Sequence, residues 1–218
     1  MNMVAKALSV CVLLCAQPSQ ASTLPPALAE LQHQLERVVY CIVSRWTHEG
    51  KTTVYHGTGV QFAPGLVATV AHQVDGMDDI ALYRGDFRFS QADIIAIDRV
   101  HDLAVLRVAK RPGGLALNTV EDMPVGTEIF KVGCPFGLFH VTAQGRIQTP
   151  RTRIDGRSLM AMDMLIYTGD SGGPVLDLQG RWLGVIRGYL TGTPNISIAM
   201  PIEQLQALIQ EAGIQGLE

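Results

Sequence analysis

Short strand-like runs, separated by turn signals, extend from residue 38 to residue 200. Val, Ile, Thr and aromatic residues gather in the runs, and Gly, Pro, Asn and Asp gather between them, as is typical of β-strands joined by turns. The first set of predicted strands is Val39–Trp46, Thr52–Phe62, Leu66–Ala71, Ile80–Tyr83, Ala92–Asp98 and Leu103–Val108. The second set is Glu128–Gly133, His140–Thr149, Ser158–Met162, Gly173–Leu176, Trp182–Tyr189 and Ile196–Met200. Because no helices alternate with these strands, the pattern favours two antiparallel barrels over a parallel sheet.

Helical periodicity is found at the two ends of this region. The N-terminal stripe has an apolar residue every third or fourth position and consists of Leu28, Leu31, Leu35 and Val38. We expect this helix either to lie on its own barrel or to join subunits in a homo-oligomer. The C-terminal stripe consists of Ile202, Leu205, Leu208, Ile209 and Ala212. Pro201 suits the first turn of that helix, and Gly213 suits its end.

These elements predict an all-β fold of two antiparallel six-stranded β-barrels with an N-terminal and a C-terminal helix. Arg111–Gly114 breaks the strand pattern and is expected to link the barrels. The predicted boundaries are 22–37 for the N-terminal helical segment, 38–110 and 115–200 for the barrels, and 201–213 for the closing helix.

The first 21 residues have the pattern of a secretory signal peptide. Lys6 precedes an apolar stretch over 7–16, and Ser19-Gln20-Ala21 is a small-x-small cleavage site. That stretch is too short for a stable membrane span, which needs about 20 residues. Lipidation at Cys15 or a retained anchor are the alternatives. We therefore expect an exported protein, either periplasmic or secreted.

Composition narrows the function classes. The chain has 218 residues, 47% of them hydrophobic, and a formal net charge of −3. The absence of a basic run argues against nucleic-acid binding. The histidines and cysteines form no His-x-x-x-His or Cys-x-x-Cys pair, so neither a metal nor another cofactor is implied.

The segment Gly169–Pro174 has the features of a nucleophile loop. Ser171 stands among glycines, which permit the tight turn that aims backbone N–H groups beside a hydroxyl. A serine needs a base to become nucleophilic. The pattern also fits the nucleophile elbow of α/β-hydrolases, but there the histidine follows the serine. The six histidines of this chain all precede Ser171, which leaves the order His, Asp, Ser.

Two upstream residues complete that order. His72 ends the apolar run 66–71, and Asp102 immediately precedes the run 103–108, unlike the neighbouring Asp98 and His101. With the segment 169–174, these blocks resemble the signature of trypsin-like (chymotrypsin-fold) serine peptidases. The Htr/Deg branch is suggested by the segments Gly57-Thr58-Gly59-Val60, Gly133-Cys134-Pro135-Phe136-Gly137 and Ala199-Met200-Pro201. Too little sequence follows for the PDZ domain that many Htr/Deg relatives carry.

The resemblance implies one peptidase unit over 38–213 and a role for each site residue. Ser171 would be the nucleophile, His72 the general base and Asp102 the group that orients the imidazole. The N–H groups of Gly169 and Ser171 would form the oxyanion hole. The expected partners are protein or peptide substrates, cleaved through an acyl-enzyme. The alternative is a catalytically inactive peptide-binding or chaperone-like module of the same fold.

Specificity is expected at Leu165, six residues before the serine, where trypsin has an aspartate. Leucine there favours cleavage after small or medium apolar residues. The edge strand that binds the substrate backbone would contain Ile186, Arg187, Gly188 and Tyr189. Arg187 could occlude the pocket or select acidic groups. Asp170 is expected to pair with an arginine of 146–157 or a hydroxyl, or to stay solvated.

Cys41 and Cys134 are the cysteines that remain after removal of the leader. An even pair in an exported protein suggests a disulfide, and two buried free thiols are the alternative. In the fold that the chain resembles, the regions around these two cysteines can approach each other.

Overall fold

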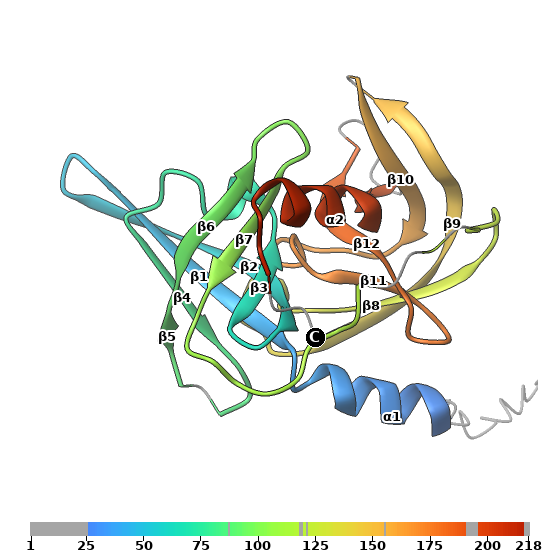
Figure 1. Ribbon diagram of the computed structural model, residues 1–218, viewed down its shortest axis with the longest axis horizontal. Coiled ribbons are helices and arrows are strands. Elements are labelled where there is room, and N and C mark those ends of the chain that lie inside the picture. The colour runs from blue at the N-terminus through green and yellow to red at the C-terminus, as the bar shows by residue number, and fades with distance from the viewer. Residues whose placement is uncertain are drawn as a thin grey trace, which may run out of the picture.

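The computed structural model describes residues 26–86, 88–117, 120, 122–154, 156–190 and 196–215. The predicted signal peptide lies outside the described residues. Strands dominate the described chain, and they form two separate sheets (Figure 1).

The first half of the chain forms a seven-stranded antiparallel sheet. Its strands are β1 (Val39–His48), β2 (Lys51–Ala63), β3 (Leu66–Thr69), β4 (Asp79–Tyr83), β5 (Ser90–Gln91), β6 (Asp93–Asp98) and β7 (Leu103–Arg107). They are hydrogen-bonded in the order β5-β4-β1-β2-β3-β7-β6, so the sheet is a curled half-barrel and not the closed six-stranded barrel expected. The two edge strands of this sheet, β5 and β6, are consecutive in the chain and are separated only by Ala92. They are connected covalently and form no hydrogen-bonded ladder with each other, so the sheet does not close.

The second half forms a closed six-stranded barrel, as predicted. Its strands are β8 (Glu128–Gly133), β9 (Val141–Ile154), β10 (Arg157–Met164), β11 (Pro174–Asp177), β12 (Trp182–Tyr189) and β13 (Ser197–Pro201), in the order β10-β13-β12-β11-β8-β9. Two short 3₁₀ turns, η1 (Ala71–Gln73) and η2 (Pro135–Gly137), follow β3 and β8. The all-β class with a helix at each end is therefore confirmed.

The helices cover the seam between the two sheets. Helix α2 (Ile202–Glu211) contacts β6 and β7 of the first sheet and β12 and β13 of the barrel, and it lies across their junction in Figure 1. Four side chains of its predicted apolar stripe, Ile202, Leu205, Leu208 and Ile209, are buried in one core cluster that contains Leu103 of β7 and Val185 of β12. Ala212, the fifth predicted member, follows the end of the helix and is exposed. Burial of each such side chain contributes about 1.5–3 kcal/mol. The closing helix thus fastens the two halves together.

Helix α1 (Pro26–Leu35) lies on the barrel of its own chain. Leu35 is buried in the same core cluster, and Leu31 packs against it and lies beside Gly180, between β11 and β12. Both α-helices of the described chain have ten residues, too few to cross a bilayer.

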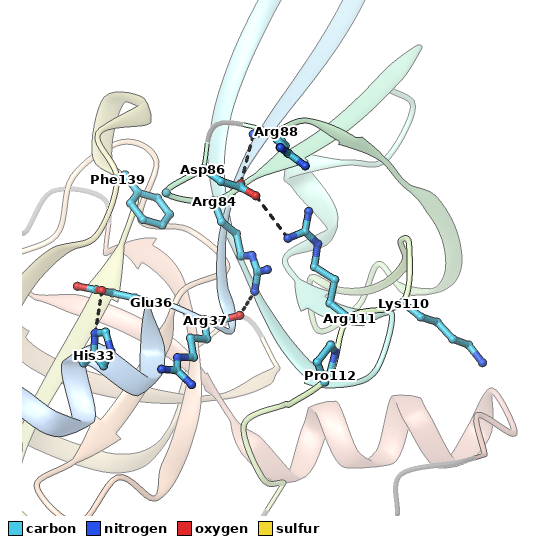
Figure 2. A pocket seen from close by; sticks show the side chains of 11 residues that line it. His33, Glu36, Arg37, Arg84, Asp86, Arg88, Lys110, Arg111, Pro112 and Phe139 are labelled. Atoms are coloured by element: carbon cyan, nitrogen blue, oxygen red, sulfur yellow. Dashed lines mark hydrogen bonds and ion pairs between the residues drawn. The ribbon is translucent and has the colours of Figure 1, made fainter.

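A groove of about 710 Å³ opens where the end of α1 meets the loop after β4 and the linker between the halves (Figure 2). Five of the side chains that line it are cationic; they are Arg37, Arg84, Arg88, Lys110 and Arg111. Only two carboxylates, Glu36 and Asp86, line it as well. Asp86 pairs with Arg111 at 3.5 Å, and the guanidinium of Arg84 lies 5.0 Å from the ring centre of Tyr40. This basic groove is a positive face on a chain whose net charge is negative.

Candidate active site

Ser171 lies in a tight loop between β10 and β11, and two glycines beside it have no possible replacement. Gly169 has φ +103°, and a Cβ atom there would lie 2.5 Å from the carbonyl oxygen of Cys134. Gly172 has φ +89°, and its Cβ would lie 2.0 Å from the carbonyl oxygen of Thr58. Any side chain would clash with the backbone of the neighbouring loops. The glycines are therefore required by the path of the chain.

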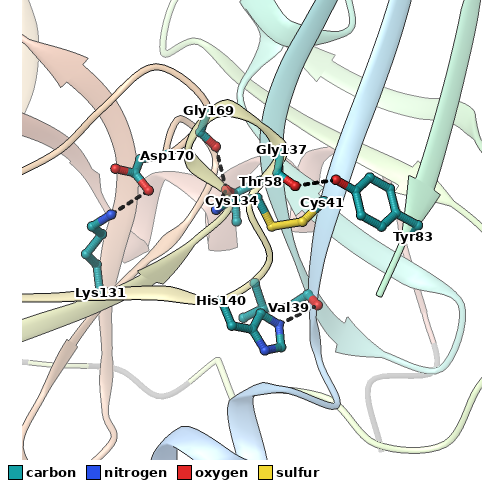
Figure 3. The surroundings of a disulfide bond; sticks show 10 residues. All are labelled: Val39, Cys41, Thr58, Tyr83, Lys131, Cys134, Gly137, His140, Gly169 and Asp170. Atoms are coloured by element: carbon teal, nitrogen blue, oxygen red, sulfur yellow. Dashed lines mark hydrogen bonds and ion pairs between the residues drawn. A yellow bond between two sulfur atoms is a disulfide. The ribbon is translucent and has the colours of Figure 1, made fainter. Parts of the chain in front are cut away.

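Thr58 of β2 fixes the serine loop to the first half of the molecule (Figure 3). Its backbone N–H donates to the carbonyl oxygen of Ser171 at 2.8 Å, and its hydroxyl donates to the carbonyl oxygen of Gly169 at 2.6 Å. The same hydroxyl accepts the N–H of Cys134 at 2.9 Å. Thr58 is fully buried, so these bonds are protected from water. Thr58 thus bonds the serine loop through both its backbone and its side chain, and its hydroxyl also connects the loop to Cys134.

The N–H groups of Gly169 and Ser171 have no hydrogen-bond partner within the described part of the chain. The neighbouring amides of the loop do have partners: Asp170 N–H donates to the carbonyl oxygen of Tyr167, and Gly172 N–H donates to that of Ile186. Within the described chain, these two N–H groups therefore remain available as hydrogen-bond donors.

His72 and Asp102 meet beside this loop. His72 lies in η1 just after β3, and Asp102 directly precedes β7. The Nδ1 atom of His72 lies 2.8 Å from Oδ2 of Asp102, and the His72 backbone N–H donates to Oδ1 at 2.8 Å. Asp102 adopts φ +58°, a left-handed conformation that is uncommon for a non-glycine residue and often marks functional sites. The carboxylate therefore orients both the ring and the backbone of His72.

The ionisation of Asp102 is set by opposing effects. Burial raises the pKa of this carboxyl, but hydrogen bonds from the ring and backbone of His72 and the charge of Arg187 outweigh burial and leave the pKa below its usual value. Asp102 is consequently an anion throughout the neutral range.

Arg187 of β12 contacts two members of this group. Its Nε donates to Oδ2 of Asp102 at 3.1 Å, and its carbonyl oxygen accepts the hydroxyl of Ser171 at 3.1 Å. In this conformation the Ser171 hydroxyl is directed to Arg187 and forms no hydrogen bond with His72. The structure thus brings His72 and Asp102 into direct contact and places Ser171 beside them on their shared neighbour.

Asp170 pairs with Lys131 of β8 (Figure 3). The Nζ of Lys131 lies 2.5 Å from Oδ1 of Asp170, both side chains are fully buried, and Oδ2 accepts the Tyr167 N–H at 2.7 Å. Burial raises the pKa of Asp170 and lowers the pKa of Lys131, and the attraction within the pair opposes both shifts. The expectation of an arginine from 146–157, a hydroxyl or water as partner is wrong, because the buried ammonium of Lys131 is the partner of Asp170.

A disulfide joins Cys41 of β1 to Cys134, the residue after β8 (Figure 3). It connects the two halves and closes a sequence separation of 93 residues. Since Cys134 also bonds Thr58 through its N–H, the disulfide lies directly behind the serine loop.

Four of the five predicted specificity residues line two hollows that share Tyr189. Leu165, 60% exposed, lines a hollow of about 320 Å³ with Met164 and Ile166. Arg187, Gly188 and His72 line the second, of about 370 Å³. Ile186 is fully buried in the barrel core and lines neither hollow.

The sequence did not predict Thr58 and Lys131 as site residues. The signal for Thr58 was the motif in which two glycines flank it, and the signal for Lys131 was a lysine within an apolar strand.

A family model described as a trypsin-like peptidase domain matches residues 57–185. A probable periplasmic serine endoprotease, DegP-like, of Halomonas elongata is 33% identical over 146 residues, which are 64% of this chain and 31% of that protein. A putative serine protease HhoA of Synechocystis is 29% identical over 66% of this chain and 39% of its own length. The chain thus spans about a third of the length of these relatives. The crystal structure of the active form of the Rv3671c protease from Mycobacterium tuberculosis is similar, with a TM-score of 0.76, 25% identity and coverage of 98% of this chain and 96% of that one.

Proposed function

Because the chain belongs to the trypsin-like peptidase family, we propose that it is a serine endopeptidase whose unit spans residues 38–213. The observation that carries this proposal is the contact of His72 with Asp102 beside the glycine-flanked loop of Ser171. In that loop the N–H groups of Gly169 and Ser171 have no partner within the described chain. DegP-like and HhoA-like relatives place the chain near the HtrA/Deg proteases.

The reaction follows from the roles of these groups. The Ser171 hydroxyl turns from the Arg187 carbonyl to Nε2 of His72, a side-chain rotation that takes picoseconds to nanoseconds at an accessible site. His72 takes the proton as Ser171 attacks the scissile carbonyl, and Asp102 stabilises the imidazolium. The N–H groups of Gly169 and Ser171 bind the oxyanion. His72 then protonates the leaving amine, and water releases the acyl group in the same manner.

The hollow beside Leu165 supports cleavage after small or medium apolar residues. Its lining includes the apolar side chains of Leu165, Met164 and Ile166. Asp163 lines it as well and is the one group there that would favour a basic residue. Hydrolysis of peptide esters that end in Val, Phe or Lys measures this preference. A clear preference for Lys would contradict it.

Export is the third part of the proposal. It is supported by the leader pattern, by the disulfide, which persists in oxidising compartments, and by relatives named periplasmic.

Contact between subunits through the N-terminal segment is proposed only for the residues before Leu31, because Leu31 and Leu35 already pack on the barrel.

The central test is covalent labelling with a fluorophosphonate. We expect the wild-type protein to be labelled and the Ser171→Ala variant not to be, with slower labelling of His72→Ala because the base is lost. A folded wild-type protein that neither takes the label nor hydrolyses any ester would favour the inactive peptide-binding module instead.

A further inference from the structure

The second hollow beside Tyr189 holds three arginines next to the proposed base. It is lined by His72, Arg99, Asp102, Arg157, Arg187, Gly188 and Tyr189. These side chains come from both halves of the molecule, with Arg99 before β7 and Arg157 at the start of β10. The hollow therefore exists only in the assembled fold.

The charges in this hollow do not balance. Arg99 is paired through Nε and Nη2 with both oxygens of Asp75, at 2.7 and 2.8 Å, so its charge is compensated. Arg187 is held by Asp102, which also bonds His72. Arg157 is held only by a neutral group, since its Nε donates to the carbonyl oxygen of Val100 at 2.5 Å. Among the described residues, Arg157 thus has no carboxylate partner.

Arg157 and Arg187 are bonded in the same way, and this leaves their outer nitrogens available. Each guanidinium is fixed through Nε, and the Nη atoms of neither make a hydrogen bond within the described chain. A guanidinium held from behind presents its remaining donors in a fixed plane, the geometry that carboxylates match best. The site is therefore built to receive an anion and needs little further ordering.

On the basis of the proposed peptidase function, we infer that this hollow binds the carboxylate of an Asp or Glu that directly precedes the apolar residue at the cleavage site. The two hollows are separated by Tyr189, and only this one reaches His72. A substrate strand extended along β12 points successive side chains to opposite sides. One side chain therefore enters the hollow of Leu165 while its neighbour faces Arg157.

The experiment uses two fluorogenic peptides that differ at one position. Both end in Val before the scissile bond, and Asp or Asn stands directly before the Val. We expect kcat/KM for the Asp peptide to be higher by about tenfold or more, the effect of one charge-assisted hydrogen bond. Arg157→Gln should bring this ratio close to one. The matched control is Arg153→Gln, which removes the same charge from an exposed position of β9 outside the hollow.

The outcomes separate the possible failures. Equal rates for the two peptides with the wild-type enzyme, in the presence of fluorophosphonate labelling, would overturn this inference and leave the peptidase proposal standing. No labelling would overturn both. If Arg157→Gln slowed both peptides equally, Arg157 would only fasten β10 to Val100. Arg157→Glu adds a positive test, because it should prefer Lys to Asp at that position.

Discussion

Lys131 and Asp170 show how the residue next to the proposed nucleophile is fixed without a new chain terminus. In the zymogens of trypsin-like enzymes, a freed N-terminal amino group pairs with the aspartate beside the serine. Here an ammonium from β8 is already in contact with Asp170, and both are buried. The serine loop therefore needs no cleavage of the chain to obtain its counter-ion.

We predict that Lys131→Met destabilises the protein by about 3–5 kcal/mol, because it leaves the carboxylate of Asp170 buried without a partner. Fluorophosphonate labelling should slow as well, since Asp170 adjoins Ser171. Urea unfolding and labelling rates measure the two effects. The control is the double variant Lys131→Met/Asp170→Asn, which removes both charges and should recover most of the stability. A single variant as stable as the wild type would contradict the prediction.

His140 makes the stability depend on pH. Burial lowers the pKa of this imidazole more than its contacts with Val39 and Glu36 raise it. The unfolded chain, whose histidines titrate near pH 6.5, therefore takes up a proton at a pH at which His140 of the folded chain is still neutral. The contribution of His140 is complete above that value and is lost as the pH falls. We expect His140→Phe to lose less stability than the wild type between pH 7 and pH 5 in urea unfolding; identical slopes would contradict this.

At the scale of elements, α2 determines whether the two halves unfold together. Leu205 is fully buried in the core cluster that contains side chains of β7 and β12. The helix touches both sheets, so its apolar face belongs to the seam and not to either half alone.

Leu205→Ala should cost about 2–5 kcal/mol, as for other large-to-small changes in a core. Because the helix spans the seam, we expect one cooperative transition at a lower urea concentration. Gln210→Ala, on the exposed side of the same helix, is the control and should stay close to the wild type. Two separate transitions in Leu205→Ala would show that α2 does not couple the halves.

At the scale of the whole molecule, the disulfide and Thr58 connect the halves behind the active site. The disulfide closes a sequence separation of 93 residues, for which chain entropy predicts about 4–5 kcal/mol of stabilisation. It also holds Cys134, whose N–H bonds Thr58, and Thr58 in turn bonds Gly169. The disulfide therefore contributes both to the stability of the protein and to the position of the serine loop.

We therefore expect Cys41→Ala/Cys134→Ala to unfold at a markedly lower urea concentration and to be labelled more slowly by fluorophosphonate. Reduction with dithiothreitol should lower the stability of the wild type in the same way and leave the double variant unaffected. A double variant with unchanged stability would contradict the prediction.

The sequence alone predicted those features of the structure that depend on the local pattern of residues. Strand runs such as Trp182–Tyr189 and Glu128–Gly133 have the predicted bounds, and the apolar run that follows Asp102 placed that residue next to β7. It could not show that Lys131 faces Asp170, because the two are distant in sequence and meet only when β8 pairs with β11. It could not show that Arg187 bonds Asp102 either, since that contact crosses the seam. The predicted closure of the first sheet is wrong, and the sequence could not show this because β5 has only two residues and leaves no strand pattern of its own.

The basic groove at the end of α1 has a consequence for encounters at a distance. A chain with a net charge of −3 is repelled as a whole by an anionic surface, yet this face carries three more cations than carboxylates. Within about 8 Å at physiological ionic strength, the local field outweighs the distant average. The electric field around the molecule therefore differs in sign from face to face, and this difference weakens as added salt shortens the screening length.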